Sequence, residues 1–269
     1  MPRPAMGRDA ATLKHVILSP LVPRYRDRVG LRALDPALVP VARHMAVSND
    51  GRIIYVNNAK AACTSVTSVV FHYTFGRPPE KGETLNNPAF RYSKPYWKEN
   101  LAALRSGTAF VFTSVRDPLA RSLSAFRNFF IDQRNRSAPP HLRAIRRFGF
   151  REDMPISKKF DIFLDYAETS LAIDPLHTDQ HFRRQVDNVA YDHITFDLIV
   201  RVESLAAGLA RIPELAGIED PHSAFVQQPH RNRSNPQDFF PNAEQRARIF
   251  SIYRPDYEAF DYAPPEGAG

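Results

Sequence analysis

Lys60 occupies a position where a polypeptide could bind a phosphate group. It follows the apolar run 53–56 and the turn residues Asn57 and Asn58, and it precedes a segment with helical spacing. Small neighbours would let an anion approach the backbone N–H groups, and the helix start would add a positive dipole end. The predicted cradle consists of Lys60, Ala61, Ala62, Cys63, Thr64 and Ser65, with Thr64 or Ser65 as N-cap.

This cradle differs from the familiar phosphate loop GxxxxGK[ST], because it contains no glycine. On its own the segment is equally compatible with an ordinary strand-to-helix connection that carries a solvated lysine. Cys63 suits a small buried filler of the loop better than a nucleophile.

Arg116 is a second cation with a similar setting. It follows the apolar run 108–115 and precedes Asp117 and Pro118, which predict a helix from there to about residue 130. Ser124 lies two turns into that helix, so a guanidinium and a hydroxyl could hold one phosphate. The alternative is that Arg116 pairs with Asp117 and that Ser124 faces solvent.

Three apolar runs, 53–56, 108–115 and 198–202, each precede a helical pattern and predict an α/β fold with a parallel sheet and helices on both faces. Such sheets bind ligands at the carboxyl ends of their strands, so Lys60 and Arg116 are expected to share one site. Further helices are predicted at 96–105, at 159–168 with Ser157 as cap, at 203–212, and from the capping box of Asn242 and Gln245 to residue 253.

Length and composition indicate how the chain is divided into domains. The 269 residues, 43% of them hydrophobic, suffice for one large domain, which we place at 51–263, after an N-terminal arm (1–50) and before a disordered tail (264–269). The basic stretch 132–159 is expected to form an exposed insertion or helix pair near a binding face. No apolar run has the length of a signal peptide or membrane span.

Charge and cysteine content narrow the function classes. A formal net charge of +7 favours anionic ligands without choosing among nucleotides, acidic polysaccharides, nucleic acids and membrane surfaces. The single cysteine permits no intrachain disulfide and no cysteine-based metal cluster, which suits a reducing cytoplasm. We expect a cytoplasmic protein, either free or peripheral to the inner membrane.

Taken together, the two cation motifs resemble a known family. Residues 60–65 and, 56 positions after Lys60, the segment around Arg116 (115–126) are similar to the type-2 carbohydrate sulfotransferases, which include chondroitin 4-O- and HNK-1-type Golgi enzymes and bacterial relatives. Residues 179–185, 196–205 and 252–262 resemble later segments of that family. Two features depart from its pattern: residues 57–59 replace the usual V-P before the lysine, and a cysteine pair before the late strand is absent.

The resemblance implies a fold related to the P-loop kinases, three-layered α/β/α with a mostly parallel sheet. It also implies the donor 3′-phosphoadenosine-5′-phosphosulfate (PAPS), no metal, and transfer of the sulfuryl group to a hydroxyl, most often of a sugar. Lys60 and residues 61–65 would bind the 5′-phosphosulfate, whereas Arg116 and Ser124 would bind the 3′-phosphate. Arg233 would cover the same phosphate, unless it belongs to a solvated basic loop.

The acceptor hydroxyl needs a proton acceptor. His181 matches the family's histidine and is the first candidate for this catalytic role, although it could instead bind the acceptor or pack structurally. Glu99 and His72 are reserve candidates. Arg183 and Arg184 could bind an acidic sugar, or serve only solubility.

The sequence leaves two other functions open. A P-loop-type kinase of small molecules or sugars would need the glycine-rich loop that is missing here. A non-catalytic binder of anionic glycans would use the positive charge but would leave the Arg116–Ser124 helix unexplained. A nucleic-acid partner is not expected, because aromatic and basic residues are not interleaved as in RNA-binding motifs.

Overall fold

A five-stranded sheet lies at the centre of the computed structural model, which describes residues 23–92, 96–218 and 239–267. The strand order is β3-β1-β2-β4-β5, and β2, β4 and β5 are parallel, whereas β1 runs antiparallel to both of its neighbours. The strands are β1 (Met45–Val47), β2 (Ile53–Val56), β3 (Arg91–Tyr92), β4 (Phe110–Val115) and β5 (Leu198–Arg201). The three predicted strands are therefore confirmed.

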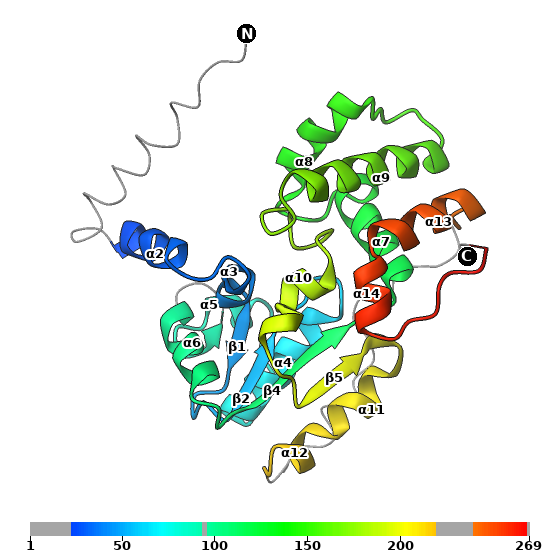
Figure 1. Ribbon diagram of the computed structural model, residues 1–269. Coiled ribbons are helices and arrows are strands. Elements are labelled where there is room, and N and C mark those ends of the chain that lie inside the picture. Colours follow the sequence, from blue (N-terminus) through cyan, green and yellow to red (C-terminus); the bar gives the residue numbers. More distant parts are fainter. Residues whose placement is uncertain (1–22, 93–95, 219–238, 268–269) are drawn as a thin grey trace.

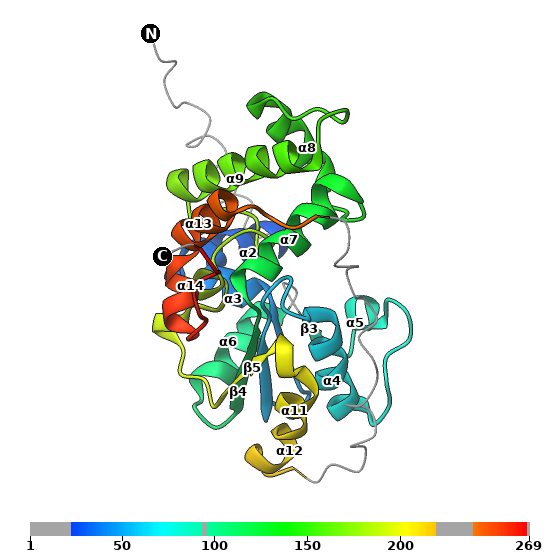
Figure 2. The ribbon, with the colours of Figure 1, turned by 90° about the vertical axis from the view of Figure 1, so that its right-hand side faces the viewer.

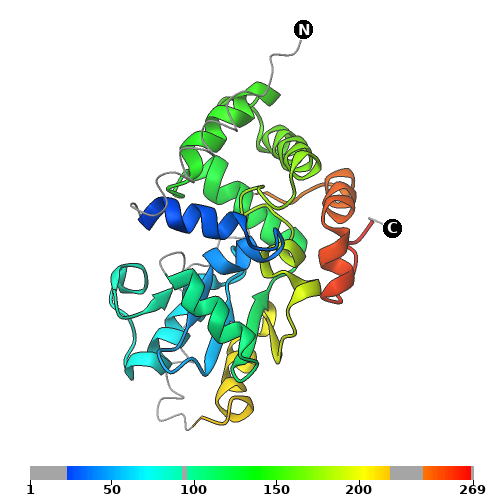
Figure 3. The ribbon, with the colours of Figure 1, turned by 60° about the vertical axis from the view of Figure 1, so that its left-hand side comes forward.

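Helices cover both faces of this sheet, which confirms the three-layer prediction (Figure 2). Alternate residues of β2 face opposite layers: Ile53 and Tyr55 pack with one set of helices, and Ile54 and Val56 with the other. The first set is α4 (Cys63–Phe75), α11 (Leu205–Ala210) and α12 (Ile212–Leu215). The second set consists of α3 (Leu38–Arg43), α6 (Trp97–Arg105) and α10 (Gln185–Val189). Figure 3 shows this side of the sheet together with α2 (Pro23–Arg32).

A helical lobe stands beside the sheet and has its own core (Figure 1). β4 leads directly into α7 (Pro118–Phe126), which carries the chain into this lobe and continues as a π-helical turn, Arg127–Ile131. The other lobe helices are α8 (Ala138–Ile145), α9 (Ile156–Ile173), α13 (Ala243–Ile252) and α14 (Arg254–Ala259). Buried phenylalanines fill the space between them: Phe126, Phe129, Phe130, Phe160, Phe163 and Phe182.

Local sequence signals explain several of these boundaries. The Asp117 side chain accepts a hydrogen bond from the Ala120 N–H, so the predicted cap of α7 is confirmed. The capping box of Asn242 and Gln245 at α13 is also confirmed. The predicted helix 203–212 is wrong as a single element, because a 3₁₀ turn (Val202–Ser204), α11 and the start of α12 share it. α12 begins at Ile212 with Pro213 in its first turn, where proline is tolerated, unlike in a helix interior.

Other boundaries differ from prediction. α9 begins at Ile156, before the predicted cap Ser157, which instead accepts hydrogen bonds from Gln245 Nε2. β1 lies inside the predicted N-terminal arm (1–50) and pairs there with β2. In the predicted tail, the Glu266 carbonyl accepts a 2.9 Å hydrogen bond from Arg246 Nε. Among the described residues no helix is long and apolar enough to cross a bilayer.

Candidate active site

The loop between β2 and α4 presents unpaired N–H groups beside Lys60. α4 begins at Cys63, and its N-cap is Ala62 in a left-handed conformation (φ 58°), so the predicted N-cap role of Thr64 or Ser65 is wrong. The N–H of Ala61 donates to Asn58, whereas those of residues 62–65 have no acceptor within the described chain. They are the orphan donors of a helix N-terminus and could receive an anion.

Buried polar contacts hold this loop in place. Asn58 is fully buried; its Nδ2 donates to the Ser114 carbonyl and to Gln185 Oε1, both at 3.0 Å, and its Oδ1 accepts from Asn188. Ser114 Oγ donates to the Ala61 carbonyl at 2.6 Å. The contacts stabilise a loop in which Lys60 and Ala62 adopt left-handed conformations, which cost of order 1 kcal/mol or more each.

The Lys60 side chain is half-buried, and its ammonium has no hydrogen bond or ion pair with any described residue. Burial lowers the pKa of Lys60 to about 8; the neighbouring Cys63 thiol opposes this shift, and the Arg116 and Arg121 charges add to it. At neutral pH the side chain is therefore mostly a cation, and no described residue serves as its counter-ion. Such a group favours an anionic ligand.

Arg116 follows β4 at the same edge of the sheet, since β4 pairs in parallel with β2 and Thr113 lies opposite Val56. Its guanidinium forms no hydrogen bond within the described chain. Burial lowers its pKa, and the nearby carboxylates of Glu203 and Asp117 oppose that shift. Because Asp117 caps α7 rather than pairing with Arg116, the guanidinium is available to a ligand.

Arg121 connects the parts of this region, and its role was not predicted. The side chain is 1% exposed. Its Nε donates to the Ala59 carbonyl at 2.9 Å, Nη1 to that of Arg183 at 2.8 Å, and Nη2 to that of Gln180 at 2.8 Å. Ala59 directly precedes Lys60, and Gln180 directly precedes His181. Because both carbonyls accept from the same planar guanidinium, their oxygens lie within roughly 8 Å of each other.

His181 is half-buried against the ring of Phe129, with ring centroids 4.8 Å apart. Its Nδ1 lies 2.6 Å from Asp179 Oδ1, and its Nε2 lies 3.2 Å from Asn135 Nδ2. Arg121 therefore holds the segment that carries His181 against the loop that carries Lys60. The catalytic role of His181 stays a prediction.

Ser124 lies one turn beyond Arg121 on the same face of α7 and is half-buried. Its hydroxyl has no hydrogen bond with a described residue, so it is available to the ligand that Arg116 would bind. Arg233, predicted to cover the same ligand, lies outside the described residues.

Gln185 links the Arg116 backbone to the helical lobe. Its Oε1 accepts from the Arg116 N–H at 3.0 Å, and its Nε2 donates to the Arg116 carbonyl at 2.8 Å. The fully buried Asp256 accepts from the N–H groups of Gln185 and Val186. Burial raises the pKa of Asp256 to about 6, although the Arg121 charge and these two N–H groups oppose the shift.

Two predicted substrate-binding residues have internal contacts. Arg183 is 7% exposed and donates from Nε and Nη2 to the Thr178 carbonyl. Arg184 is half-buried and donates from Nε to the Ile252 carbonyl. Contact of either side chain with an acidic sugar stays a prediction.

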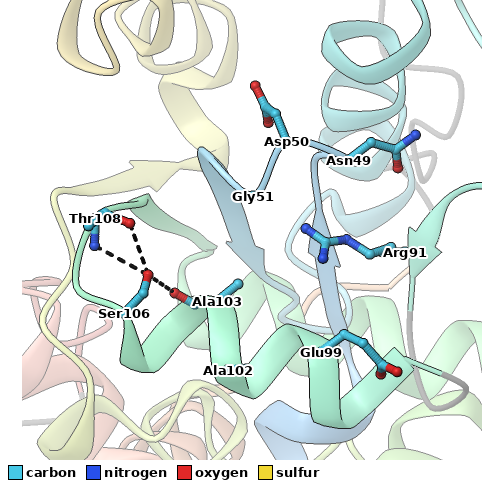
Figure 4. Close-up of a pocket in the computed structure, with 9 residues that line it drawn as sticks. All are labelled: Asn49, Asp50, Gly51, Arg91, Glu99, Ala102, Ala103, Ser106 and Thr108. Atoms are coloured by element: carbon cyan, nitrogen blue, oxygen red, sulfur yellow. Dashed lines mark hydrogen bonds between the residues drawn. The ribbon is translucent and has the colours of Figure 1, made fainter.

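The reserve bases lie away from Lys60. Glu99 lines a shallow hollow of about 440 Å³ beside Gly51, at the edge of the sheet where β2 begins (Figure 4). His72 is buried in α4, about 13 Å along the helix from Cys63. Neither residue is at the strand ends that Lys60 and Arg116 follow.

The positioning residues that sequence reasoning missed are polar; five are buried and Asp179 is half-buried: Asn58, Arg121, Asp179, Gln185, Asn188 and Asp256. Two of them had weak local signals: Arg121 is three residues before Ser124, and Asp179 is two before His181. The others act across more than 60 residues of sequence. Among the described residues no cluster of three metal-ligating side chains occurs.

Comparison with known proteins gives one family. The model of the sulfotransferase family matches residues 43–263. Carbohydrate sulfotransferase 11 of Mus musculus is 26% identical over 254 residues, which cover 83% of this chain and 68% of the mouse protein, and the Rattus norvegicus protein gives the same values. The Danio rerio protein of that name is 24% identical over 248 residues. No solved structure gives a significant match.

Proposed function

Because the chain belongs to the sulfotransferase family, we propose that it transfers the sulfuryl group of PAPS to a hydroxyl of a carbohydrate. The family match supports the donor, and the name of the relatives, carbohydrate sulfotransferase 11, supports a carbohydrate acceptor. The match does not favour the kinase alternative, nor a non-catalytic binder of anionic glycans. A cytoplasmic location stays part of the proposal.

The observation that carries this proposal is a pair of cations, Lys60 and Arg116, that follow neighbouring parallel strands and have no hydrogen bond or ion pair among the described residues. PAPS has an anionic group at each end of its adenosine, a 5′-phosphosulfate and a 3′-phosphate. We assign the first to Lys60 and the N–H groups of residues 62–65, and the second to Arg116 and Ser124. Recognition of the 3′-phosphate would distinguish the donor from ATP.

Lys60 would stabilise the charge that develops in an in-line displacement. The acceptor oxygen forms a bond to sulfur while the bond from sulfur to the 5′-phosphate oxygen breaks, and the electron pair of that bond leaves with the phosphate. The Lys60 ammonium and the orphan N–H groups would meet this charge without reorganisation. His181 Nε2 would take the hydroxyl proton. The proposed reaction uses no metal ion, because a sulfuryl group carries less charge than a phosphoryl group.

Donor selectivity and transfer test this function. We expect the product 3′-phosphoadenosine 5′-phosphate (PAP), at 100 times its Kd, to stabilise the protein by about 2.7 kcal/mol, or roughly 5–10 °C in Tm. ATP with Mg²⁺, and heparin, should stabilise it less. The unaltered enzyme should also transfer labelled sulfate from PAPS to a glycan fraction. Equal or greater stabilisation by ATP with Mg²⁺, or no effect of PAP, would contradict the proposal.

A further inference from the structure

The amide of Asn135 has a defined orientation next to His181. Its Oδ1 accepts a 2.8 Å hydrogen bond from the Ser137 N–H, which can only donate. The amide nitrogen Nδ2 is therefore the atom that points the other way, toward Asn128 Oδ1 at 3.1 Å and toward His181 Nε2 at 3.2 Å. An amide NH₂ has hydrogens to donate and accepts none. His181 Nε2 must consequently act as the acceptor.

The tautomer of His181 follows from this contact. A neutral imidazole carries one N–H, and since Nε2 accepts, the hydrogen is on Nδ1. Nδ1 lies 2.6 Å from Asp179 Oδ1, a short distance suited to an N–H donating to a carboxylate. The backbone N–H of His181 donates to the same oxygen at 2.9 Å, which fixes the carboxylate relative to the ring.

The second oxygen of Asp179 is also held. His141 Nε2 lies 3.2 Å from Asp179 Oδ2, and His141 Nδ1 lies 2.7 Å from the hydroxyl of Tyr166. Burial raises the pKa of Asp179, but hydrogen bonds from His141 and His181 outweigh it and keep that pKa well below its usual range. An ionised Asp179 accepts only, so each histidine donates one N–H to it. The carboxylate cannot rotate without losing one of these bonds.

We propose that Asp179 is a positioning residue that, braced by His141, keeps His181 in the Nδ1–H tautomer with its Nε2 lone pair directed at the acceptor hydroxyl. This inference rests on the proposed sulfuryl transfer. In the free enzyme the Asn135 amide donates to His181 Nε2, and in the complex the acceptor hydroxyl donates there in its place. As the new oxygen–sulfur bond forms, the hydroxyl O–H bond breaks and the proton moves to Nε2. The resulting imidazolium is stabilised by the Asp179 carboxylate.

Replacement of Asp179 by asparagine tests this assignment. An amide at position 179 that keeps its oxygen toward Nδ1, where that oxygen also accepts from the His181 N–H, lacks the carboxylate charge that stabilises the imidazolium; an amide that turns its NH₂ there would place the ring hydrogen on Nε2 and remove the proton acceptor. We expect kcat for Asp179→Asn to fall about 10³-fold, while Kd for PAP changes less than about twofold. Nitrogen-15 NMR of histidine-labelled protein, assigned with His181→Gln, should show the ring hydrogen of His181 on Nδ1 in the unaltered enzyme.

Asp174→Asn is the matched control, because Asp174 pairs with the exposed His177 at 3.0 Å outside this assembly, and its kcat should be unchanged. The inference is overturned if Asp179→Asn keeps kcat within tenfold, or if the unaltered His181 carries its hydrogen on Nε2. The tautomer of His181 is measured in the unaltered enzyme, so it tests the inference even if Asp179→Asn does not fold. Absence of transfer by an unaltered enzyme that shows the expected tautomer would instead overturn the proposed function.

Discussion

Lys60→Ala is expected to reduce sulfuryl transfer by about 10³-fold or more and to leave the protein folded. The ammonium is the one full charge that we assign to the leaving phosphate oxygen, and loss of a single preorganised donor at such a site already costs about 10²–10³ in rate. Since Lys60 makes no hydrogen bond with a described residue, its removal leaves no buried partner unpaired. The measurement is kcat/KM for PAPS together with Tm.

Lys81→Ala, at an exposed turn, is the control and should retain full activity. The pH dependence of PAP affinity gives a second test of the Lys60 assignment. Because burial lowers that pKa to about 8, the cation is lost as pH rises through 8, and PAP affinity should fall there. In Lys60→Arg the charge persists at higher pH, so the decline in affinity should disappear. Lys60→Ala protein with more than a tenth of the normal kcat/KM would contradict the assignment.

Arg121→Met should have the largest effect on stability, about 3–5 kcal/mol in the free energy of unfolding. Methionine has a similar length but no N–H groups, so the carbonyls of Ala59, Gln180 and Arg183 would lose their donor inside the protein. The buried Asp256 would also lose a nearby positive charge. Urea unfolding followed by circular dichroism gives this free energy and the m-value.

Two variants separate this effect from a general loss of charge. Arg105→Met removes an exposed arginine from the end of α6 and should change the free energy by less than about 0.5 kcal/mol. Arg121→Lys keeps the charge but cannot reach three carbonyls at once, so an intermediate loss is expected. A loss of less than about 1 kcal/mol for Arg121→Met would show that these three hydrogen bonds do not hold the region together.

Local patterns sufficed for much of the fold. β2 and β4 are apolar runs rich in β-branched and aromatic residues, and each ends in turn or capping residues. Asp117 and Pro118 mark the start of α7 because a carboxylate can accept the first N–H groups and proline needs no acceptor. The cations after these strands were predictable for the same reason, since parallel strands place their carboxyl ends at one edge.

Long-range contacts account for what could not be predicted. A buried arginine and an exposed one look alike in a sequence, so Arg121 and Arg183 gave no sign that they bind backbone carbonyls. Ala62 caps α4 in a left-handed conformation although local preference favours Thr64 or Ser65, because the loop is held by Asn58 and its partners. Three-residue β1 is too short for a recognisable alternation.

The central claim is that Lys60 and Arg116 bind opposite ends of one nucleotide, and calorimetry with PAP and with adenosine 5′-phosphate, which lacks the 3′-phosphate, tests it most directly. The unaltered protein should prefer PAP by about 10- to 100-fold. Arg116→Ala should lose this preference and keep its affinity for adenosine 5′-phosphate, whereas Lys60→Ala should weaken both ligands and keep the preference. If Arg116→Ala weakens both ligands equally, or neither, the two cations do not share one nucleotide.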